Sequence, residues 1–316
     1  MSQAPAPTQR RMTPEAWVLL SLIALFWGIS FAATRAALFD VQVATLVALR
    51  VGGGALALWI YIVAARIPFR VSWRTLLVFA FMGVMNNVIP WSLIAWGQLH
   101  IASGLAAILN ASTAIFTVCL AALLFHDERM TPAKMVGVLL GFAGVVTVMG
   151  TDALRSLDLT SLGQLAIILA SICYAFASTF GRHFATGQPP EVAAAGMLTV
   201  SSLIMVPLAL AHDGVPNFAA WHPATFVALG YHGIVSSALA FLCFYRLLRV
   251  AGAGNASLVT LMIAPVSVVV GAVLFGETLT AADYAGFVLL ALGLLVIDGR
   301  VRVPGKNSRE LSDGRG

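Results

Sequence analysis

The sequence predicts an all-α integral membrane protein, with ten transmembrane helices arranged as two inverted five-helix repeats. Three observations lead to this fold class: an apolar composition, a long stretch that occurs twice, and a one-sided distribution of basic residues. The 316 residues are 60% hydrophobic and 10% charged. Soluble domains have roughly 45–50% apolar and about 25% charged residues. The composition therefore indicates a polytopic membrane protein with short loops.

Apolar segments long enough to cross a hydrocarbon core of about 30 Å as helices recur along the chain. We place ten of them at residues 16–37, 43–64, 75–98, 103–125, 133–150, 161–182, 192–211, 223–246, 254–275 and 281–298. Residues 1–13 and 300–316 are polar and are predicted to be cytoplasmic tails. The first apolar segment is of full length and many follow it, which argues against a secretion signal.

One stretch of the chain occurs twice, at residues 103–150 and 253–298. The turn L-F-H-D-E-R-M-T that ends at Thr131 matches the turn L-F-G-E-T-L-T that ends at Thr280. Aligned pairs in the two copies and in the segments before them are Glu128 with Glu277, Gly137 with Gly286, Gly144 with Gly293, Trp27 with Tyr174, and Arg35 with Arg182. Internal repeats fix the architecture first, so we divide the chain into a first repeat at 14–150 and a second at 151–299.

Basic residues collect in alternate loops. Of the 18 Lys and Arg residues, all but Arg35, Arg50 and Arg155 fall in the tails or in the loops after the second, fourth, sixth and eighth segments. The positive-inside rule then places both termini in the cytoplasm and supports an even number of spans. Because each repeat has an odd number of spans, the second is inverted relative to the first. Such repeats are typical of secondary transporters, in which one half rocks against the other. We expect a bacterial-type inner (plasma) membrane location.

The Trp27-Gly28 pair, Arg50, and the twin turns followed by glycine-rich helices give the chain a familiar pattern. It resembles the drug/metabolite transporter superfamily, and within it the ten-helix EamA-type exporters, over about residues 15–300. The resemblance implies export of amino acids and other small metabolites. One departure is that Pro265 lies in the middle of the ninth segment, whereas the equivalent stretch 110–117 has no proline.

Polar residues at helical spacing mark four of the segments. They are Asn110, Thr113 and Thr117; Ser257, Thr260 and Ser267; Trp27, Ser30 and Thr34; and Ser171, Tyr174 and Ser178. Polar groups inside a membrane need a partner or a water-filled cavity, so we predict that these stripes line a shared central cavity. The alternative is that the hydroxyl groups bond within their own helices or hold neighbouring helices together.

The third segment contains Asn86 and Asn87 shortly before Pro90 and Trp91. Proline has no N–H group, so Pro90 leaves the carbonyl of Asn86 without its helical donor. That carbonyl and the two amides would then contact substrate. The alternative is a kinked helix in which the asparagines satisfy the backbone locally. Trp91 would either stack on substrate or pack in the bundle.

Two titratable residues within the apolar segments have more than one possible role. His232, next to Tyr231, would either couple transport to protons or act as a structural hydrogen-bonding residue. Arg50, near the outer end of the second segment, would either be a structural anchor, by snorkelling or by bonding backbone carbonyls, or bind a carboxylate. Both alternatives remain open for each residue.

Several kinds of chemistry are disfavoured. The Asp and Glu residues lie outside the predicted spans or at or near their ends, as Asp283 and Asp298 do, which argues against cation–proton exchange of the small multidrug type. No Walker A loop or H-E-x-x-H spacing occurs, and the three cysteines have no metal-ligand spacing. We expect no cofactor, no metal, no catalytic residue and no nucleic-acid partner. Glu128 and Glu277 are interpreted as N-terminal caps of the helices that follow them.

The sequence thus predicts a secondary exporter of small metabolites, with amino acids as the expected substrates and neutral or weakly basic drugs as the alternative. A small molecule and the lipid bilayer are the expected partners, and a monomer and a homodimer are both compatible with the sequence. The residues predicted to bind substrate are Trp27, Ser30, Asn86, Asn87, Pro90, Trp91, Asn110, Thr113, Tyr174, Ser178, Tyr231, His232, Ser257, Thr260 and Pro265.

Overall fold

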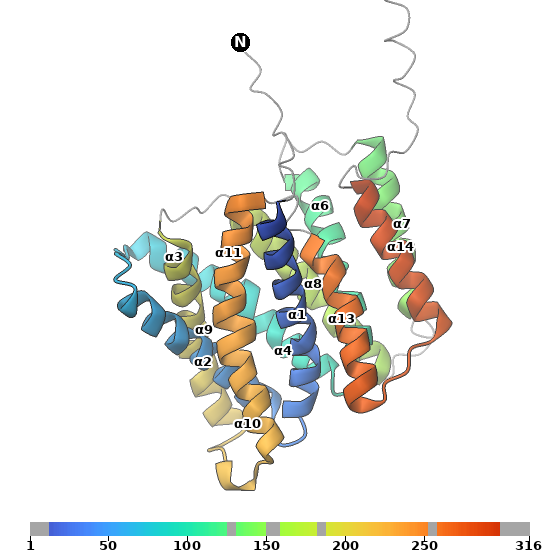
Figure 1. Cartoon of the computed structure of the whole chain (residues 1–316). Coiled ribbons are helices and arrows are strands. Elements are labelled where there is room, and N and C mark those ends of the chain that lie inside the picture. Colours follow the sequence, from blue (N-terminus) through green and yellow to red (C-terminus); the bar gives the residue numbers. More distant parts are fainter. Residues whose placement is uncertain (1–12, 125–130, 150–158, 182–187, 252–257, 298–316) are drawn as a thin grey trace, which may run out of the picture.

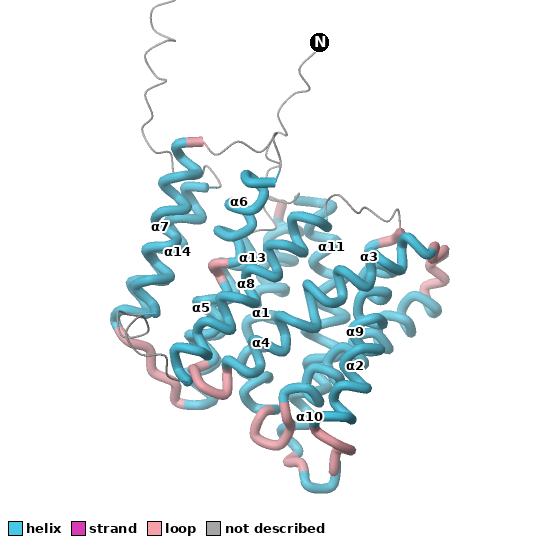
Figure 2. The backbone as a smooth tube through the Cα atoms, turned by 180° about the vertical axis from the view of Figure 1, so that it is seen from behind, coloured by secondary structure: helices cyan, strands magenta, loops and turns pink. Residues whose placement is uncertain are grey.

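The computed structural model describes residues 13–124, 131–149, 159–181, 188–251 and 258–297. Over these residues it is helical, with no strand (Figure 2). The helices are α1 (Pro14–Ala37), α2 (Val43–Ala64), α3 (Trp73–Gly83), η1 (Val84–Val88), α4 (Ile89–Gly97), α5 (Ser103–Asn110), α6 (Thr113–Leu124), α7 (Pro132–Met149), α8 (Leu159–Gly181), α9 (Pro190–His212), η3 (Phe218–Ala220), α10 (Pro223–Gly230), η4 (Tyr231–Leu239), α11 (Ala240–Ala251), α13 (Leu258–Phe275) and α14 (Ala281–Ile297).

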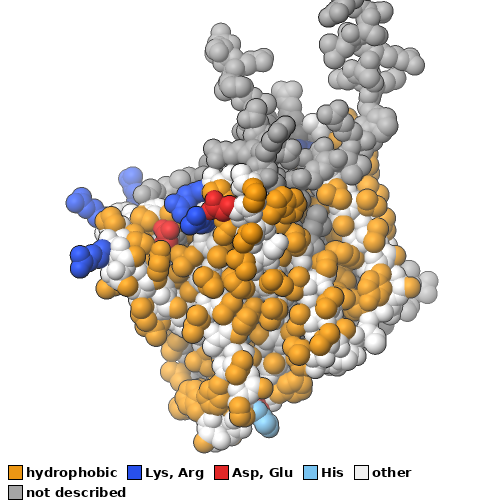
Figure 3. Space-filling view, viewed as in Figure 1, with side chains coloured by type: hydrophobic (Ala, Val, Ile, Leu, Met, Phe, Trp, Pro, Cys, Tyr) orange, Lys and Arg blue, Asp and Glu red, His pale blue; other side chains and the backbone are white. Residues whose placement is uncertain are grey.

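Seven helical stretches within the described residues are long and apolar enough to cross a membrane. They cover 14–37, 43–64, 73–97, 103–124, 160–180, 190–212 and 223–251. Shorter apolar helices cover 132–147, 262–275 and 281–297. The visible face of the molecule carries hydrophobic side chains over most of its height (Figure 3). These features are those of a multi-pass membrane protein, which confirms the class predicted from composition.

The bundle has two chemically different ends. At one end, called the Glu15 end, α1 begins and α11 finishes, and Arg246 forms an ion pair with Glu15 at 2.6 Å (Figure 1). The Lys and Arg side chains that Figure 3 shows lie at this end. At the other, called the Asp40 end, α1 finishes and α10 begins, with Asp40 in the connection from α1 to α2.

The first residues of several helices explain where those helices start. The Thr13 hydroxyl accepts a hydrogen bond from the Ala16 N–H at 3.2 Å, and Ser72 accepts one from Thr75 at 3.2 Å. Such side chains satisfy N–H groups that have no partner within the helix. Proline stands first in α1, α7, α9 and α10, where its missing N–H is not needed.

Helices far apart in the sequence pack in pairs. Helix α7 lies along α14, α2 along α9, α1 along α13 and α4 along α8 (Figures 1 and 2). Between α7 and α14 the backbones approach so closely that a Cβ on Gly144 would lie 2.7 Å from the carbonyl oxygen of Gly286. A Cβ on Gly137 would likewise lie 2.6 Å from the carbonyl oxygen of Gly293. These glycines therefore serve packing within one chain.

The interruptions of the helices differ from what prolines alone suggest. Helix α13 continues through Pro265, whereas the proline-free stretch after Asn110 is where α5 ends and α6 begins. At this break Ser112 donates to the carbonyl of Leu109 and Thr113 to that of Asn110, both at 2.7 Å. Hydroxyl groups, not a proline ring, thus accompany this break between the two helices.

Two wide helical turns of the π type lie in the third and eighth predicted segments. The first, η1, directly precedes α4 and Pro90. The second, η4, begins at Tyr231 and contains no proline. π-Turns are frequent at functional sites, and both lie beside predicted substrate-binding residues.

Candidate functional site

The first part of the site is the contact between α1 and η4. The Trp27 Nε1–H donates to the carbonyl of Ser236 at 3.0 Å, and the Tyr231 hydroxyl donates to the carbonyl of Phe26 at 2.9 Å. Each helix therefore satisfies a backbone oxygen of the other. Trp27 also packs against Phe241 and Phe244 of α11. Trp27 and Tyr231, two of the aromatic residues predicted to bind substrate, thus use their donor groups to join α1 and η4. Their rings remain available for other contacts.

His232 lies next to this contact. Its side chain is fully buried, with Nε2 3.2 Å from the Thr34 hydroxyl and Nδ1 3.4 Å from the Ser236 hydroxyl. Both ring nitrogens therefore have a hydrogen-bonding neighbour. These contacts fit the structural alternative for His232, and proton coupling stays a prediction.

Trp27 and Tyr174, the residues aligned by the repeat, occupy a shared position in the packing. The buried core consists of two clusters, and both side chains pack against both clusters. They are therefore at the seam between the two cores. Tyr174 also interacts with the side chain of Trp91.

Arg50 lies in the same region. Its guanidinium carbon is 3.7 Å from the ring centroid of Trp91, and the side chain is only 8% exposed. Tyr174, Tyr231 and His232 are its electrostatic neighbours. Snorkelling to the surface was one form of the structural alternative for Arg50, but here Trp91 holds the guanidinium inside the bundle.

Most of the predicted hydroxyl groups bond to their own helix. Ser30 donates to the carbonyl of Trp27 at 2.6 Å, Thr34 to Ser30 at 2.9 Å, and Thr117 to Thr113 at 2.8 Å. Such bonds satisfy the hydroxyl without a cavity. Asn110 differs, because its buried Oδ1 has no hydrogen-bond partner.

The remaining predicted site residues are dispersed. Asn87 is fully buried, and its side-chain Nδ2 donates to the Ser201 hydroxyl of α9 at 3.2 Å. The Nδ2 of Asn86 lies 3.5 Å from the Oδ1 of Asn87. Pro90 is buried and Thr260 half-buried. Ser178 is exposed, and so is Pro265, on the same face of α13 as the exposed Val269 and Val273. Ser257 lies outside the described residues.

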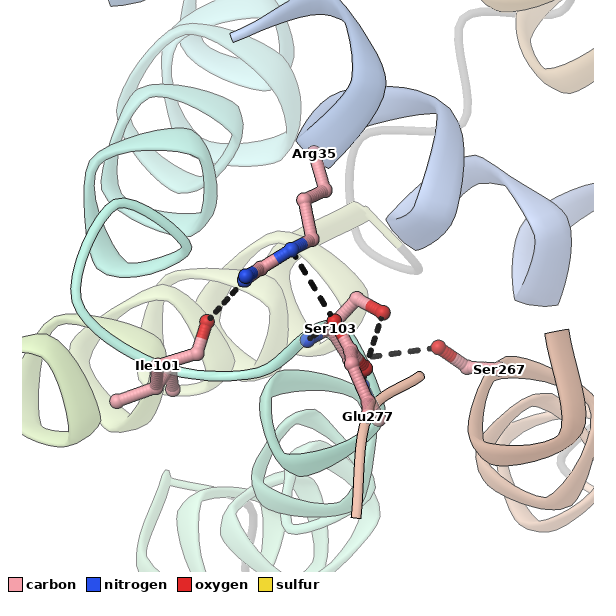
Figure 4. A network of polar contacts seen from close by, with 6 residues as sticks. Arg35, Ile101, Ser103, Ser267 and Glu277 are labelled. Atoms are coloured by element: carbon pink, nitrogen blue, oxygen red, sulfur yellow. Dashed lines mark hydrogen bonds and ion pairs between the residues drawn. The ribbon is translucent and has the colours of Figure 1, made fainter. Parts of the chain in front are cut away.

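A second polar cluster closes the Asp40 end (Figure 4). The Glu277 carboxylate accepts hydrogen bonds from the Ser103 N–H at 2.9 Å, the Ser103 hydroxyl at 2.8 Å and the Gly104 N–H at 3.2 Å. Arg35 Nε lies 3.4 Å from the same carboxylate. Ser267 donates to the Ser103 carbonyl at 3.2 Å. Glu277 is therefore a cap of α5, and the prediction that it caps the following helix is wrong.

Local backbone geometry directs Glu277 toward α5. Gly276 has a positive φ of 62°, which favours glycine and ends α13 with a sharp turn. A Cβ on Gly271 would collide with the Glu277 carboxylate. The following helix, α14, has its own cap, because Asp283 accepts hydrogen bonds from the N–H and hydroxyl of Thr280 at 2.7 and 2.8 Å.

Two more carboxylates at the Asp40 end cap helices that are distant in sequence. Asp213, which follows α9, accepts from the N–H and hydroxyl of Thr45 in α2, both at 2.7 Å. Asp40 accepts from the His222 N–H at 2.7 Å and from the hydroxyl of Thr225 in α10. Hydrogen bonds from Thr225 and then from His222 lower the pKa of Asp40 to about 2. Desolvation raises the pKa of Asp213, but hydrogen bonds from His212 and Thr45 outweigh it and the net shift is downward.

Sequence reasoning missed these links between distant segments, because a capping pair has no fixed separation in the sequence. One signal was available. Arg35 and Arg50 were exceptions to the distribution of basic residues, and in the structure Arg35 meets Glu277 while Arg50 meets Trp91.

Comparisons with known proteins identify similar chains. The EamA-like transporter family matches residues 15–150 and again residues 161–298. An uncharacterized transporter of Archaeoglobus fulgidus is 25% identical over 89% of this chain and 98% of its own length. A probable terminal-alkyne amino-acid exporter of Streptantibioticus cattleyicolor is 28% identical over 92% and 95%. A crystal structure shares the fold, with a TM-score of 0.64 and 20% identity over 89% of this chain and 96% of that chain.

Proposed function

The chain belongs to the EamA-like transporter family, and we propose that it is a secondary transporter that exports small metabolites, with amino acids as its substrates. The observation that carries this proposal is the seam between the two core clusters, where Trp27 and Tyr174 each pack against both clusters. Aromatic rings at such a seam provide a contact surface for a small organic molecule that passes between two halves. A relative named as a probable amino-acid exporter supports the substrate class.

We further propose ten spans in two inverted five-helix repeats. The apolar parts of the three shorter helices have 14 to 17 residues. The complete helices are α7 at 132–149, α13 at 258–275 and α14 at 281–297, and it is these full lengths that support the count. A membrane helix needs about 17–25 residues, so each reaches the lower end of that range. The two separate family matches, one in each half, also support a repeat.

The packing of helices supports the same proposal. If the repeats are equivalent, each contact between two spans has a counterpart between the matching spans of the other repeat. The contact of α1 with α13 has its counterpart in that of α8 with α6. The contact of α2 with η4 has its counterpart in that of α9 with α3, and the contact of α1 with α11 in that of α8 with α4. The contacts of α7 with α14 and of α2 with α9 map onto themselves. All of these contacts occur, as a twofold relation between the halves requires.

The orientation follows from the charges. Arg66, Arg70, Arg74, Arg246 and Arg249 belong to the connections and helix ends that the repeat assigns to one side. We infer that this side, the Glu15 end, faces the cytoplasm and that the Asp40 end faces outward. Both termini are then cytoplasmic, and the membrane is the bacterial-type inner membrane, as for a relative in Escherichia coli named an inner membrane transporter.

Flux into proteoliposomes tests the proposal. Purified protein is reconstituted and offered each of the standard amino acids in labelled form, with protein-free liposomes as the background. We expect uptake of a subset of amino acids above background, and the Trp27→Ala/Tyr174→Ala double variant to lose most of it. No uptake of any amino acid by folded protein contradicts the substrate class. Uptake of neutral or weakly basic drugs in that case supports the alternative. Repeating the assay with an imposed pH gradient distinguishes proton coupling from facilitated transport.

A further inference from the structure

Arg50 is a buried cation whose surroundings lack an anion. It lies about two turns into α2. Only 8% of it is exposed. Over the described ranges it makes no hydrogen bond or ion pair, and its buried Nε has no acceptor. A guanidinium has five N–H donors and stays charged in proteins. Such a group inside a membrane bundle is costly unless something balances it.

The described acidic residues do not provide that balance, because they lie at helix ends and most of them are engaged there. Asp40 meets His222 and Thr225, Asp213 meets Thr45, and Glu277 meets Ser103 and Arg35. Glu15, Glu191 and Asp283 lie in the first turns of α1, α9 and α14. The charge of Arg50 is therefore left for a group that is not part of these helices.

Trp91 fixes the guanidinium without using its donors. The guanidinium carbon is 3.7 Å from the centroid of the indole ring, so that the cation rests on the ring face. A cation on the face of tryptophan is held by the ring quadrupole. The N–H bonds of a guanidinium point outward in its own plane, so stacking on one face leaves them available. Trp91 thus positions Arg50 for a planar, two-oxygen acceptor.

The other neighbours complete a recognition site. Tyr174 and Tyr231 are electrostatic neighbours of Arg50 and lie on α8 and η4, both in the second half of the chain, whereas Arg50 and Trp91 belong to the first half. Ser237, also on η4, has a buried hydroxyl with no hydrogen-bond partner. Its Cβ lies 2.8 Å from where a Cβ on Gly54 would be, one helical turn beyond Arg50. A fully buried donor and an unpaired cation therefore occur on facing helices.

We propose that Arg50 binds the carboxylate of the transported amino acid, in bidentate fashion, with Trp91 as its support. This inference rests on the proposed function and narrows it to substrates that carry a carboxylate. Arg is suited to this role because its fork matches the two carboxylate oxygens, whereas Lys presents a single point of charge. The substrate neutralises a charge that the empty bundle leaves unbalanced, so an amide or amine analogue of the same size is rejected.

The experiment compares each transported amino acid with its carboxamide in proteoliposomes. For the wild type we expect the labelled amino acid to move at least tenfold faster than its amide, and excess unlabelled amide to compete poorly. Arg50→Gln is expected to lose this discrimination. Arg50→Lys keeps the charge and is expected to raise the KM for the amino acid at least tenfold with a smaller change in kcat. Arg74→Gln, which removes an exposed arginine at the start of α3, is the matched control and should behave as the wild type.

The outcomes separate the two proposals. Absence of flux for every amino acid in the wild type overturns the proposed function. Flux of amino acids together with equal flux or competition by the amides overturns the role of Arg50 and leaves the proposed function in place. A structural role of Arg50 predicts that acid and amide lose flux in equal proportion in Arg50→Gln, which also overturns the inference. If both Arg50 variants fail to fold, the wild-type comparison of acid and amide still decides.

Discussion

Arg35 Nε lies 3.4 Å from the carboxylate of Glu277, which joins the end of α1 to the turn between α13 and α14 (Figure 4). The two partners differ in environment, because the Glu277 side chain is 6% exposed and that of Arg35 is 34% exposed. Glu277 also accepts hydrogen bonds from two backbone N–H groups of α5. The ion pair is therefore the outer part of a buried cap, and removal of the glutamate affects more than one helix.

The first prediction concerns this cap. Glu277→Ala leaves the N–H groups of Ser103 and Gly104 without an acceptor, and we expect a loss of about 2–3 kcal/mol of stability. Glu277→Gln keeps one acceptor oxygen and should lose less. Thermal unfolding in detergent measures both. Glu15→Gln, which removes an exposed ion pair at the opposite end, is the control and should cost under about 1 kcal/mol. Equal effects of Glu277→Ala and Glu15→Gln contradict the prediction.

The second prediction concerns the contact between α1 and η4. Trp27→Phe removes the donor to Ser236 together with part of the indole ring system, and Tyr231→Phe removes the donor to Phe26 but keeps its ring. Each substitution is expected to destabilise the protein by about 0.5–1.5 kcal/mol. Unfolding of the single and double variants in detergent tests this. Unchanged stability in both single variants speaks against the two hydrogen bonds.

The third prediction concerns the glycines between α7 and α14. A Cβ on Gly144 would lie 2.7 Å from the Gly286 carbonyl oxygen, so Gly144→Ala must push the helices apart. We expect a loss of about 1–3 kcal/mol, as for other overpacked sites. Gly52→Ala in α2 is the matched control, because nothing lies within 4 Å of its added Cβ. The control should be neutral or slightly stabilising, since alanine favours a helix over glycine. Equal destabilisation by both changes argues against the close contact.

The fourth prediction concerns pH. Hydrogen bonds from Thr225 and His222 lower the pKa of Asp40 from 3.8 to about 2. Since the folded protein favours the ionised form, this contribution to stability is complete above about pH 4 and is lost as the pH falls toward about 2. The difference in Tm between the wild type and Asp40→Asn should therefore narrow over that interval and stay constant above it. Thr225→Val removes the largest cause of the shift and should weaken this acid dependence. A difference in Tm that does not change with pH contradicts the assignment.

Much of the fold follows from the sequence, because apolar length, helix caps and the distribution of arginines depend on local residues. The predicted segment 43–64 coincides with α2, and 223–246 begins at the first residue of α10. Asn110 to Thr117 and Pro265 were misleading, because the hydroxyl-rich stretch breaks its helix and the proline does not. Hydroxyl bonds to the preceding turn compete with the helix in a way that composition does not reveal.

The site was less accessible to sequence reasoning. Trp27, Tyr231 and His232 were identified as polar or aromatic residues of their spans. Each bonds to a residue of another helix, and the sequence does not say which residue that is. Arg50 was recognised as unusual, whereas its contact with Trp91 depends on how α2 and α4 pack. Such relationships arise only when the halves come together.

The caps at the Asp40 end have a consequence for how that end can open. Glu277, Asp213 and Asp40 each supply acceptors to the first turn of a helix that is distant in sequence. If the helices separate slightly while the region stays dry, the N–H groups have neither a carboxylate nor water, which is unfavourable. If water enters, both the N–H groups and the carboxylates are satisfied again. The caps therefore favour a sealed arrangement or a fully hydrated one over a slightly parted dry one.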